Sequence, residues 1–149
     1  MIGSLMMCVA TVVLLTGMLA GIVMGVEQNF TLMPAHAHLN LVGGVLLFLF
    51  GLYYRVVPAA GTTTLAKVQG WLHMIGAILF PTGIAVVLLK GPSFEAAPIA
   101  GSLIMVAAMG LFAVIVLAVQ PNSTLRPRPF WLPRPCRRSS SGAIGCSSR

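Results

Sequence analysis

The chain consists of long apolar runs separated by short breaks that contain proline, glycine or charged residues. Four such runs fill roughly the first 119 residues, and they predict helices over residues 1–26, 35–57, 65–89 and 96–119. Each run has at least about 20 residues, the length that an α-helix needs to cross a hydrocarbon core about 30 Å thick. A strand of a membrane barrel would alternate between apolar and polar positions, and these runs are apolar throughout. The pattern therefore predicts an all-α fold, an integral membrane four-helix transmembrane bundle.

The breaks have the composition of helix ends. Pro34 suits the first turn of the second helix, where its missing N–H costs no hydrogen bond. Pro58 ends that helix, and we expect residues 59–64 to form a small, polar linker. A Gly-Pro pair at 91–92 ends the third helix, because neither residue continues a helix well.

The composition agrees with a lipid environment. Of the 149 residues, 58% are hydrophobic and only 7% are charged, whereas a soluble domain has about 25% charged residues. The net charge of +7 is concentrated in residues 120–149, a Pro/Arg/Ser-rich tail with six arginines and no acidic residue. We expect this tail to be disordered or to lie at the membrane interface. A basic segment beside a membrane helix is typical of the cytoplasmic side, so the charge does not indicate nucleic-acid binding.

Basic residues in the short loops predict the orientation in the bilayer. Arg55 and Lys67 flank the second loop, which lies on the same side as the tail because two helices separate them. The first loop has no Lys or Arg, and the third has only Lys90. Since short loops with Lys and Arg stay in the cytoplasm, we expect a multi-pass protein of a bacterial-type inner membrane with both termini cytoplasmic. The first run lacks a basic n-region, so we expect a membrane helix rather than a cleaved signal peptide.

The first helix carries Gly17, Gly21 and Gly25 at a spacing of four residues. Residues at this spacing lie on one face of a helix. A face of small residues lets a neighbouring helix approach closely. We interpret this stripe as a packing surface.

Three histidines are the candidates for chemistry: His36, His38 and His73. Ionisable side chains within a membrane are costly and commonly functional. His36 and His38 are two residues apart, about 200° around a helix, so they point in nearly opposite directions. A regular helix should therefore not bring both imidazoles to one metal ion.

His36 lies in line with Asn40, Gly43 and Gly44, a stripe of small residues that a flat macrocycle can approach. A neutral imidazole is a good axial ligand for heme iron. The pattern leaves two interpretations open. One is a heme site, and the other is a pair of interfacial histidines that form hydrogen bonds with the backbone or with Asn40.

His73 lies about eight residues into the third helix, which starts on the cytoplasmic side. Helix rise and membrane thickness place it about 15 Å from His36 in depth. The two histidines should therefore not bind one heme iron within a single chain. His73 serves either a second cofactor or a polar contact between helices, and the second interpretation is favoured.

Three stretches in the second and third helices resemble a known family: PAHAHLNLVGG, LYYRVV and VQGWLHMIGAILFPTG. They are similar to the amino-terminal part of the catalytic subunit (subunit I) of heme–copper oxidases, and most of all to the C-type branch, the cytochrome cbb-type oxidases. The resemblance covers about residues 30–90. The shared features are Pro-x-His at 34–36, Gly-Gly at 43–44, Tyr-Tyr at 53–54, Gly-Trp at 70–71 and Pro-x-Gly at 81–83.

The resemblance implies that His36 corresponds to the axial ligand of low-spin heme b, with His38 a close second. In that family the second low-spin heme ligand, the high-spin heme ligand and the copper-binding histidines lie on later helices, which this sequence does not contain. The chain is therefore not expected to reduce dioxygen alone, and the resemblance leaves open whether it is an enzyme.

These observations favour a small membrane protein that binds heme b for electron transfer, heme handling or assembly of a respiratory complex. The second axial ligand would then come from a homo-oligomer or from another subunit. The alternative is a cofactor-free structural or interaction protein that packs through glycine-rich helix faces. A transporter is least favoured, because the apolar runs contain no Asp or Glu to balance a cation.

Overall fold

The computed structural model describes residues 2–119, and the Pro/Arg/Ser-rich tail expected to be disordered lies outside this range. The described part is helical and contains no strand. Four helical stretches in it are long and apolar enough to cross a membrane, which confirms the expected all-α class. The elements are α1 (Ile2–Glu27), α2 (Met33–His38), the π-helix η1 (Leu39–Leu46), α3 (Leu47–Val56), α4 (Pro58–Gly61), α5 (Thr64–Lys90), the 3₁₀-helix η2 (Pro92–Phe94) and α6 (Ala96–Val119).

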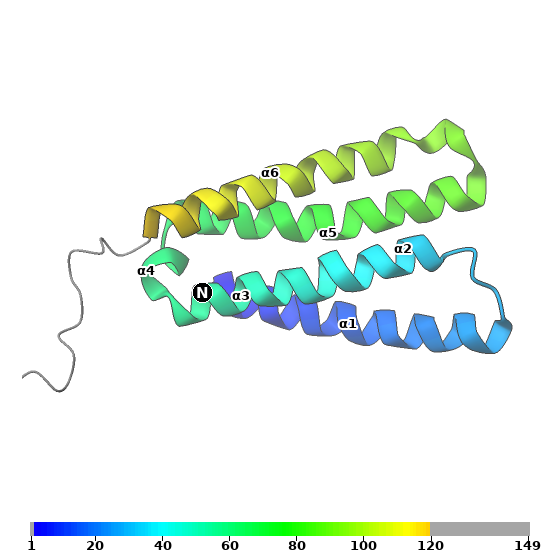
Figure 1. The fold of residues 1–149 in the computed structure, drawn as a ribbon, viewed down its shortest axis with the longest axis horizontal. Coiled ribbons are helices and arrows are strands. Elements are labelled where there is room, and N and C mark those ends of the chain that lie inside the picture. Colours follow the sequence, from blue (N-terminus) through cyan, green and yellow to red (C-terminus); the bar gives the residue numbers. More distant parts are fainter. Residues whose placement is uncertain (1, 120–149) are drawn as a thin grey trace, which may run out of the picture.

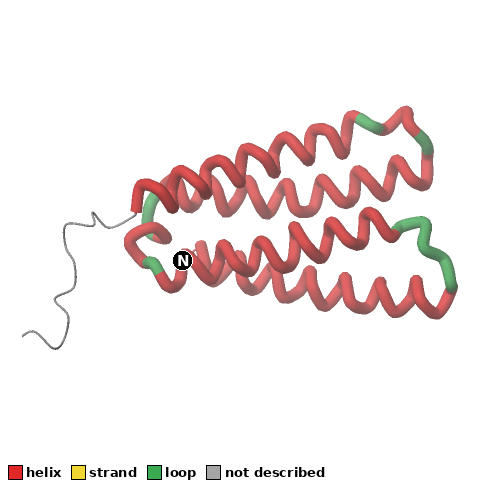
Figure 2. The backbone as a smooth tube through the Cα atoms, viewed as in Figure 1, coloured by secondary structure: helices red, strands yellow, loops and turns green. Residues whose placement is uncertain are grey.

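The helices form two antiparallel hairpins that lie side by side (Figure 1). The first hairpin pairs α1 with the continuous stretch α2–η1–α3, and the second pairs α5 with α6. The start of α1, the short helix α4 and the end of α6 lie together, and we refer to this as the α4 end. The connections 28–32 and 91–95 lie at the opposite end, the loop end, at the right of Figure 2, where the first is green and the second is green on either side of η2.

The second long helix is not a regular α-helix. The sequence predicts one helix over 35–57, whereas the structure has a π-helix of 8 residues between α2 and α3. A π-helix closes each hydrogen bond over five residues, so its turn is wider, and it occurs mostly as short pieces at functional sites. Gly43 and Gly44 lie within this segment and are both buried.

The connection at the α4 end contains one helical turn. Pro58–Gly61 forms the single turn α4, which begins at the proline that ends the second long helix and continues into the expected linker 59–64. Thr63 then caps α5, because its side-chain oxygen accepts a hydrogen bond from the N–H of Ala66 at 3.1 Å. A threonine in this position satisfies one of the unpaired N–H groups at a helix start.

The best-buried side chains lie in the half of the bundle toward α4. Phe50 of α3 stacks on Phe112 of α6, with 4.0 Å between the ring centroids. Tyr54 meets the same ring edge-on, and Met6 and Leu47 are fully buried in this cluster. Large apolar side chains on the outside of the long helices are mostly exposed, so the bundle presents an apolar surface to its surroundings.

Glycines bring the paired helices into backbone contact. A Cβ atom at Gly3 of α1 would lie 2.7 Å from the carbonyl oxygen of Gly51 in α3. In the second hairpin, a Cβ atom at Gly101 of α6 would lie 2.6 Å from Cα of Phe80 in α5. No side chain fits at these distances, so both hairpins depend on small residues for close packing.

Candidate functional site

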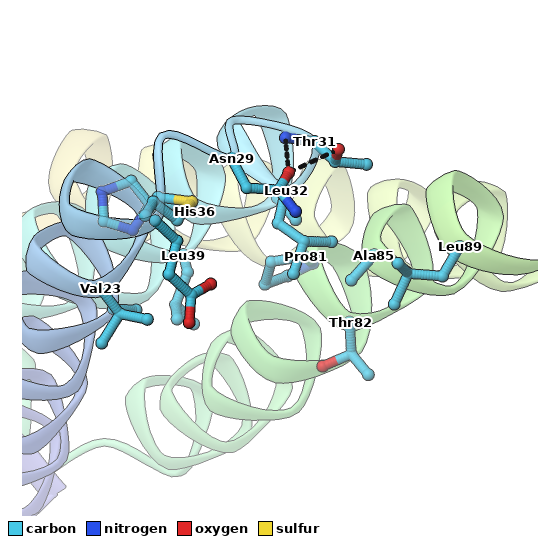
Figure 3. Close-up of a pocket in the computed structure, with 14 residues that line it drawn as sticks. Val23, Asn29, Thr31, Leu32, His36, Leu39, Pro81, Thr82, Ala85 and Leu89 are labelled. Carbon is cyan, nitrogen blue, oxygen red and sulfur yellow. Dashed lines mark hydrogen bonds between the residues drawn. The ribbon is translucent and has the colours of Figure 1, made fainter.

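A cavity of about 540 Å³ opens at the loop end, between the two hairpins. Its walls come from the last turns of α1, from α2 and from the carboxyl-terminal third of α5 (Figure 3). His36 and Val23 lie on one side in this view, and Thr82, Ala85 and Leu89 lie on the other. The lining is mostly apolar: Ala20, Val23, Met24, Glu27, Asn29, Thr31, Leu32, Ala35, His36, Leu39, Pro81, Thr82, Ala85 and Leu89.

His36 is the only histidine among the residues that line this cavity. Its half-buried ring lies against α1 at Gly21, where an added Cβ atom would be 3.2 Å from Cε1 and 3.4 Å from Nε2. The small size of Gly21 therefore leaves just enough room for the imidazole to lie between α1 and α2.

Asn40 lies one turn after His36 and holds its ring. The Asn40 amide nitrogen is 3.1 Å from Nε2 and 3.4 Å from Nδ1 of His36, and it also donates to the His36 carbonyl at 3.2 Å. Because the amide nitrogen contacts the ring and also donates to the His36 carbonyl, Asn40 fixes the imidazole relative to its own backbone.

The glycine stripe of α1 is the surface that receives these two side chains. Asn40 lies in contact with Gly17, and His36 lies against Gly21. Gly25 differs, because an added Cβ atom there would meet nothing within 4 Å. The stripe thus packs side chains of the same chain at two positions and is open at the third.

Gly43 and Gly44 continue the stripe that begins with His36 and Asn40 on the second long helix, but neighbouring helices cover this part of the stripe. A Cβ atom at Gly43 would lie 3.1 Å from Val13 and 3.4 Å from the carbonyl oxygen of Ala77, and Gly44 contacts Leu14. We expected this stripe to admit the edge of a macrocycle. The structure fills the space beside the two glycines with α1 and α5, and only the His36 end of the stripe lines the cavity.

His38 points away from the cavity, toward α5. Its ring meets Phe80 edge-on at 4.9 Å, and its Nδ1–H donates to the carbonyl of Pro34 at 2.7 Å. His36 and His38 therefore contact different helices, in keeping with their separation around the helix. Both contact the groups that the cofactor-free interpretation assigns to them, which are Asn40 and the backbone.

His73 lies in the half of the bundle toward α4 and is fully buried. Its Nε2–H donates to the carbonyl of Val42 in η1 at 3.1 Å, and its ring meets Phe50 edge-on. One turn earlier, the buried Gln69 accepts a hydrogen bond from the hydroxyl of Tyr54 at 3.0 Å. His73 thus makes the polar contact between helices that the sequence favoured, and it does not line the cavity.

Residues 2–119 contain no group of three or more His, Cys, Asp or Glu side chains that could hold a metal ion. Within these residues, the cavity lining supplies one histidine, His36, and does not offer a complete metal cage. Its mouth is ordered by Asn29, whose side-chain oxygen accepts from the backbone N–H and the hydroxyl of Thr31 at 3.1 Å and 2.8 Å.

Sequence reasoning did not single out Glu27, Asn29, Thr31 and the α5 residues as cavity lining. The polar loop after α1 was visible as a connection, but its place at a cavity mouth depends on how far the two hairpins separate. No family model, curated protein or solved structure matches this chain.

Proposed function

We propose that this chain is a multi-pass protein of a bacterial-type inner membrane that binds heme b in the cavity at the loop end, with His36 as an axial ligand. The observation that carries the proposal is the position of His36, a histidine at the wall of an apolar cavity in a bundle of membrane-spanning length. The resemblance of residues 30–90 to the heme–copper oxidase catalytic subunit supports the same residue.

The chemistry of the cavity suits an apolar macrocycle that has one polar edge. Its volume falls within the range of about 300–1,000 Å³ common for small-molecule sites. Glu27 is the only charged residue in the lining, so the wall supplies no cation for the acidic propionates, and these would have to reach water at the cavity mouth. Lys90 follows the lining residue Leu89 and is the one basic residue in the described chain near this end.

Each residue of the site has a defined part in the proposed complex. His36 binds the iron, Asn40 orients its imidazole, and Gly21 leaves room for the ring. A bound heme would supply one-electron transfer between ferrous and ferric iron. The second axial ligand would come from a symmetry-related copy, since a twofold dimer presents the same histidine twice, or from another subunit. The protein would then serve electron transfer, heme handling or assembly of a respiratory complex.

Both termini are proposed to lie in the cytoplasm. Arg55 and Lys67 are at the α4 end, where the described chain also begins and ends. The loop end has only Lys90, and this difference in basic residues supports a cytoplasmic α4 end. The heme site would accordingly lie near the outer face.

A cavity-filling variant tests the location of the proposed heme site. In detergent, the purified chain should bind supplied heme, and Ala85→Phe should weaken this binding by roughly tenfold or more. The reason is that overpacking a filled site costs about 1–3 kcal/mol, and 1.4 kcal/mol is tenfold in affinity. Ala107→Phe is the matched control, because Ala107 is exposed on α6 away from the cavity. The measurement is a heme titration followed by absorbance.

Two results would reject this location. One is a wild-type chain that takes up no heme, and the other is an Ala85→Phe variant that binds heme as well as Ala107→Phe does.

A cofactor-free structural role is the second candidate, and one observation favours it. His36 and His38 both contact polar groups within the chain, so neither requires a ligand. Packing between copies would then use the open glycines, because Gly17 and Gly21 are already covered. This candidate expects Gly25→Leu or Gly110→Leu to change the oligomeric state in detergent. Replacement of all three histidines by alanine should leave that oligomeric state unchanged.

A further inference from the structure

The buried histidine His73 takes no part in the proposed heme site, yet it forms the one side-chain hydrogen bond observed between α5 and η1 in the described chain. Its exposed fraction is 0%, and its ring is held edge-on by Phe50. The partner of its Nε2–H is the carbonyl of Val42, which lies near the middle of the π-helix.

A π-helix as long as η1 needs support from outside itself, because π-helices occur mostly as single turns within α-helices. The neighbour of Val42 also touches α5: a Cβ atom at Gly43 would lie 3.4 Å from the carbonyl oxygen of Ala77. His73 and Ala77 are one turn apart on α5. The centre of η1 is therefore held by a hydrogen bond and a backbone contact from the same face of α5.

The π-helix also reaches the cavity, where Leu39 is part of the lining and Asn40 contacts the ring of the lining residue His36. Asn40 belongs to η1, and its amide extends back to the ring of His36 while its other side rests on Gly17. Asn40 is the second residue of η1, and Val42 lies two residues after it. Loss of the hydrogen bond at Val42 would free the first turn of η1 to move, and Asn40 would move with it relative to His36.

We propose that His73 is a positioning residue: its hydrogen bond to Val42 keeps η1 in the π form, and η1 in turn orients Asn40 and the imidazole of His36 at the cavity. The importance of this for heme rests on the proposed function, but the orientation itself does not. The proposal thus links the orientation of His36 to His73, a residue in the other hairpin and in the other half of the bundle.

Three variants separate this role from general core stability. His73→Leu removes the donor, whereas His73→Gln keeps a donor nitrogen at a similar reach from the backbone. Gln69→Leu is the matched control, because Gln69 is also fully buried on α5, one turn away, and its hydrogen bond goes to Tyr54 rather than to η1.

The primary readout needs no heme: NMR shifts of the His36 ring nitrogens and of the backbone carbonyls of residues 39–46, in detergent with ¹⁵N and ¹³C labels. His73→Leu should move both sets, His73→Gln should restore them, and Gln69→Leu should leave them as in the wild type. The second readout is heme affinity, which should fall by up to about 10-fold in His73→Leu, the lower end of the usual 10- to 100-fold effect of losing an outer-shell partner, because His73 acts through Asn40.

The proposal is overturned if His73→Leu leaves the His36 and η1 shifts unchanged, or if Gln69→Leu moves them equally. Should His73→Leu fail to fold, His73→Asn replaces it, because the shorter amide no longer reaches Val42; shifts equal to those of His73→Gln then reject the proposal. A wild type that binds no heme rejects the proposed function alone, since the NMR comparison still decides the positioning role.

Discussion

At the residue scale, the glycines of α1 show how identical residues at equal spacing acquire different roles. Gly17 contacts Asn40, Gly21 lies against His36, and Gly25 has open space beside it. All three lie on one face of α1, and because all are glycine, the same substitution changes the same side chain at each position. Differences between variants at these positions therefore report on the packing of the opposite helix.

Replacing Gly17 by Ala should destabilise the protein by about 1–3 kcal/mol, because the added methyl group displaces Asn40 from a well-packed contact. Gly25→Ala should change the free energy of unfolding by no more than about 0.5 kcal/mol, as is usual for open positions. The measurement is equilibrium unfolding in mixed micelles. Equal effects of the two substitutions would show that Asn40 does not occupy the space beside Gly17.

The sequence predicted the local part of the candidate site but not its walls. That His36 and His38 face apart, and that Asn40 follows His36 by one turn, are consequences of helical periodicity. The approach of Thr82 and Ala85 to His36 joins residues about 50 positions apart in the chain. It depends on the spacing of the two hairpins, which no local pattern encodes.

At the element scale, the second long helix shows where sequence periodicity stops being informative. Its ends follow from Pro34 and Pro58, and these are local signals that a sequence displays directly. Its π-helical middle lies against α5, which contacts Val42 and Gly43. An apolar run without polar positions carries the same composition whether its turns are α or π, so only the packed structure distinguishes them.

The start of α5 offers a test of local helix stability at the α4 end. Thr63→Ala removes the side chain that accepts from the N–H of Ala66, and it should destabilise the protein by about 1 kcal/mol. Thr64→Ala is the control, since its side chain is exposed and alanine favours helix. Unfolding of both variants should be compared in one detergent. A Thr63→Ala variant as stable as Thr64→Ala would contradict the cap.

At the scale of the whole molecule, two hairpins place the start and the end of the described chain at the same end of the bundle. Four helices of spanning length make this arrangement necessary if each crosses the bilayer once. The two ends differ in charge, because Arg55 and Lys67 lie at the α4 end and Lys90 lies alone at the other. The proposed orientation, with the α4 end in the cytoplasm, rests on that difference.

Cysteine labelling tests the orientation directly. In a chain whose native cysteines are replaced by alanine, Ser93→Cys should react with a membrane-impermeant maleimide in intact cells whose outer envelope admits the reagent. Thr62→Cys should react only after the inner membrane is permeabilised. Both positions are exposed and lie in the connections at opposite ends. The reverse labelling pattern would place the proposed heme site near the cytoplasm.

The central claim is that His36, rather than His38, binds heme iron at the cavity. The most direct measurement is the absorption spectrum of heme-supplied His36→Gly, recorded before and after free imidazole is added, with His38→Gly alongside. We expect His38→Gly to keep the wild-type spectrum, and His36→Gly to lose it and regain it with imidazole, because the removed side chain leaves room for that ligand. A wild-type spectrum in His36→Gly without imidazole, or its loss in His38→Gly alone, would contradict the assignment.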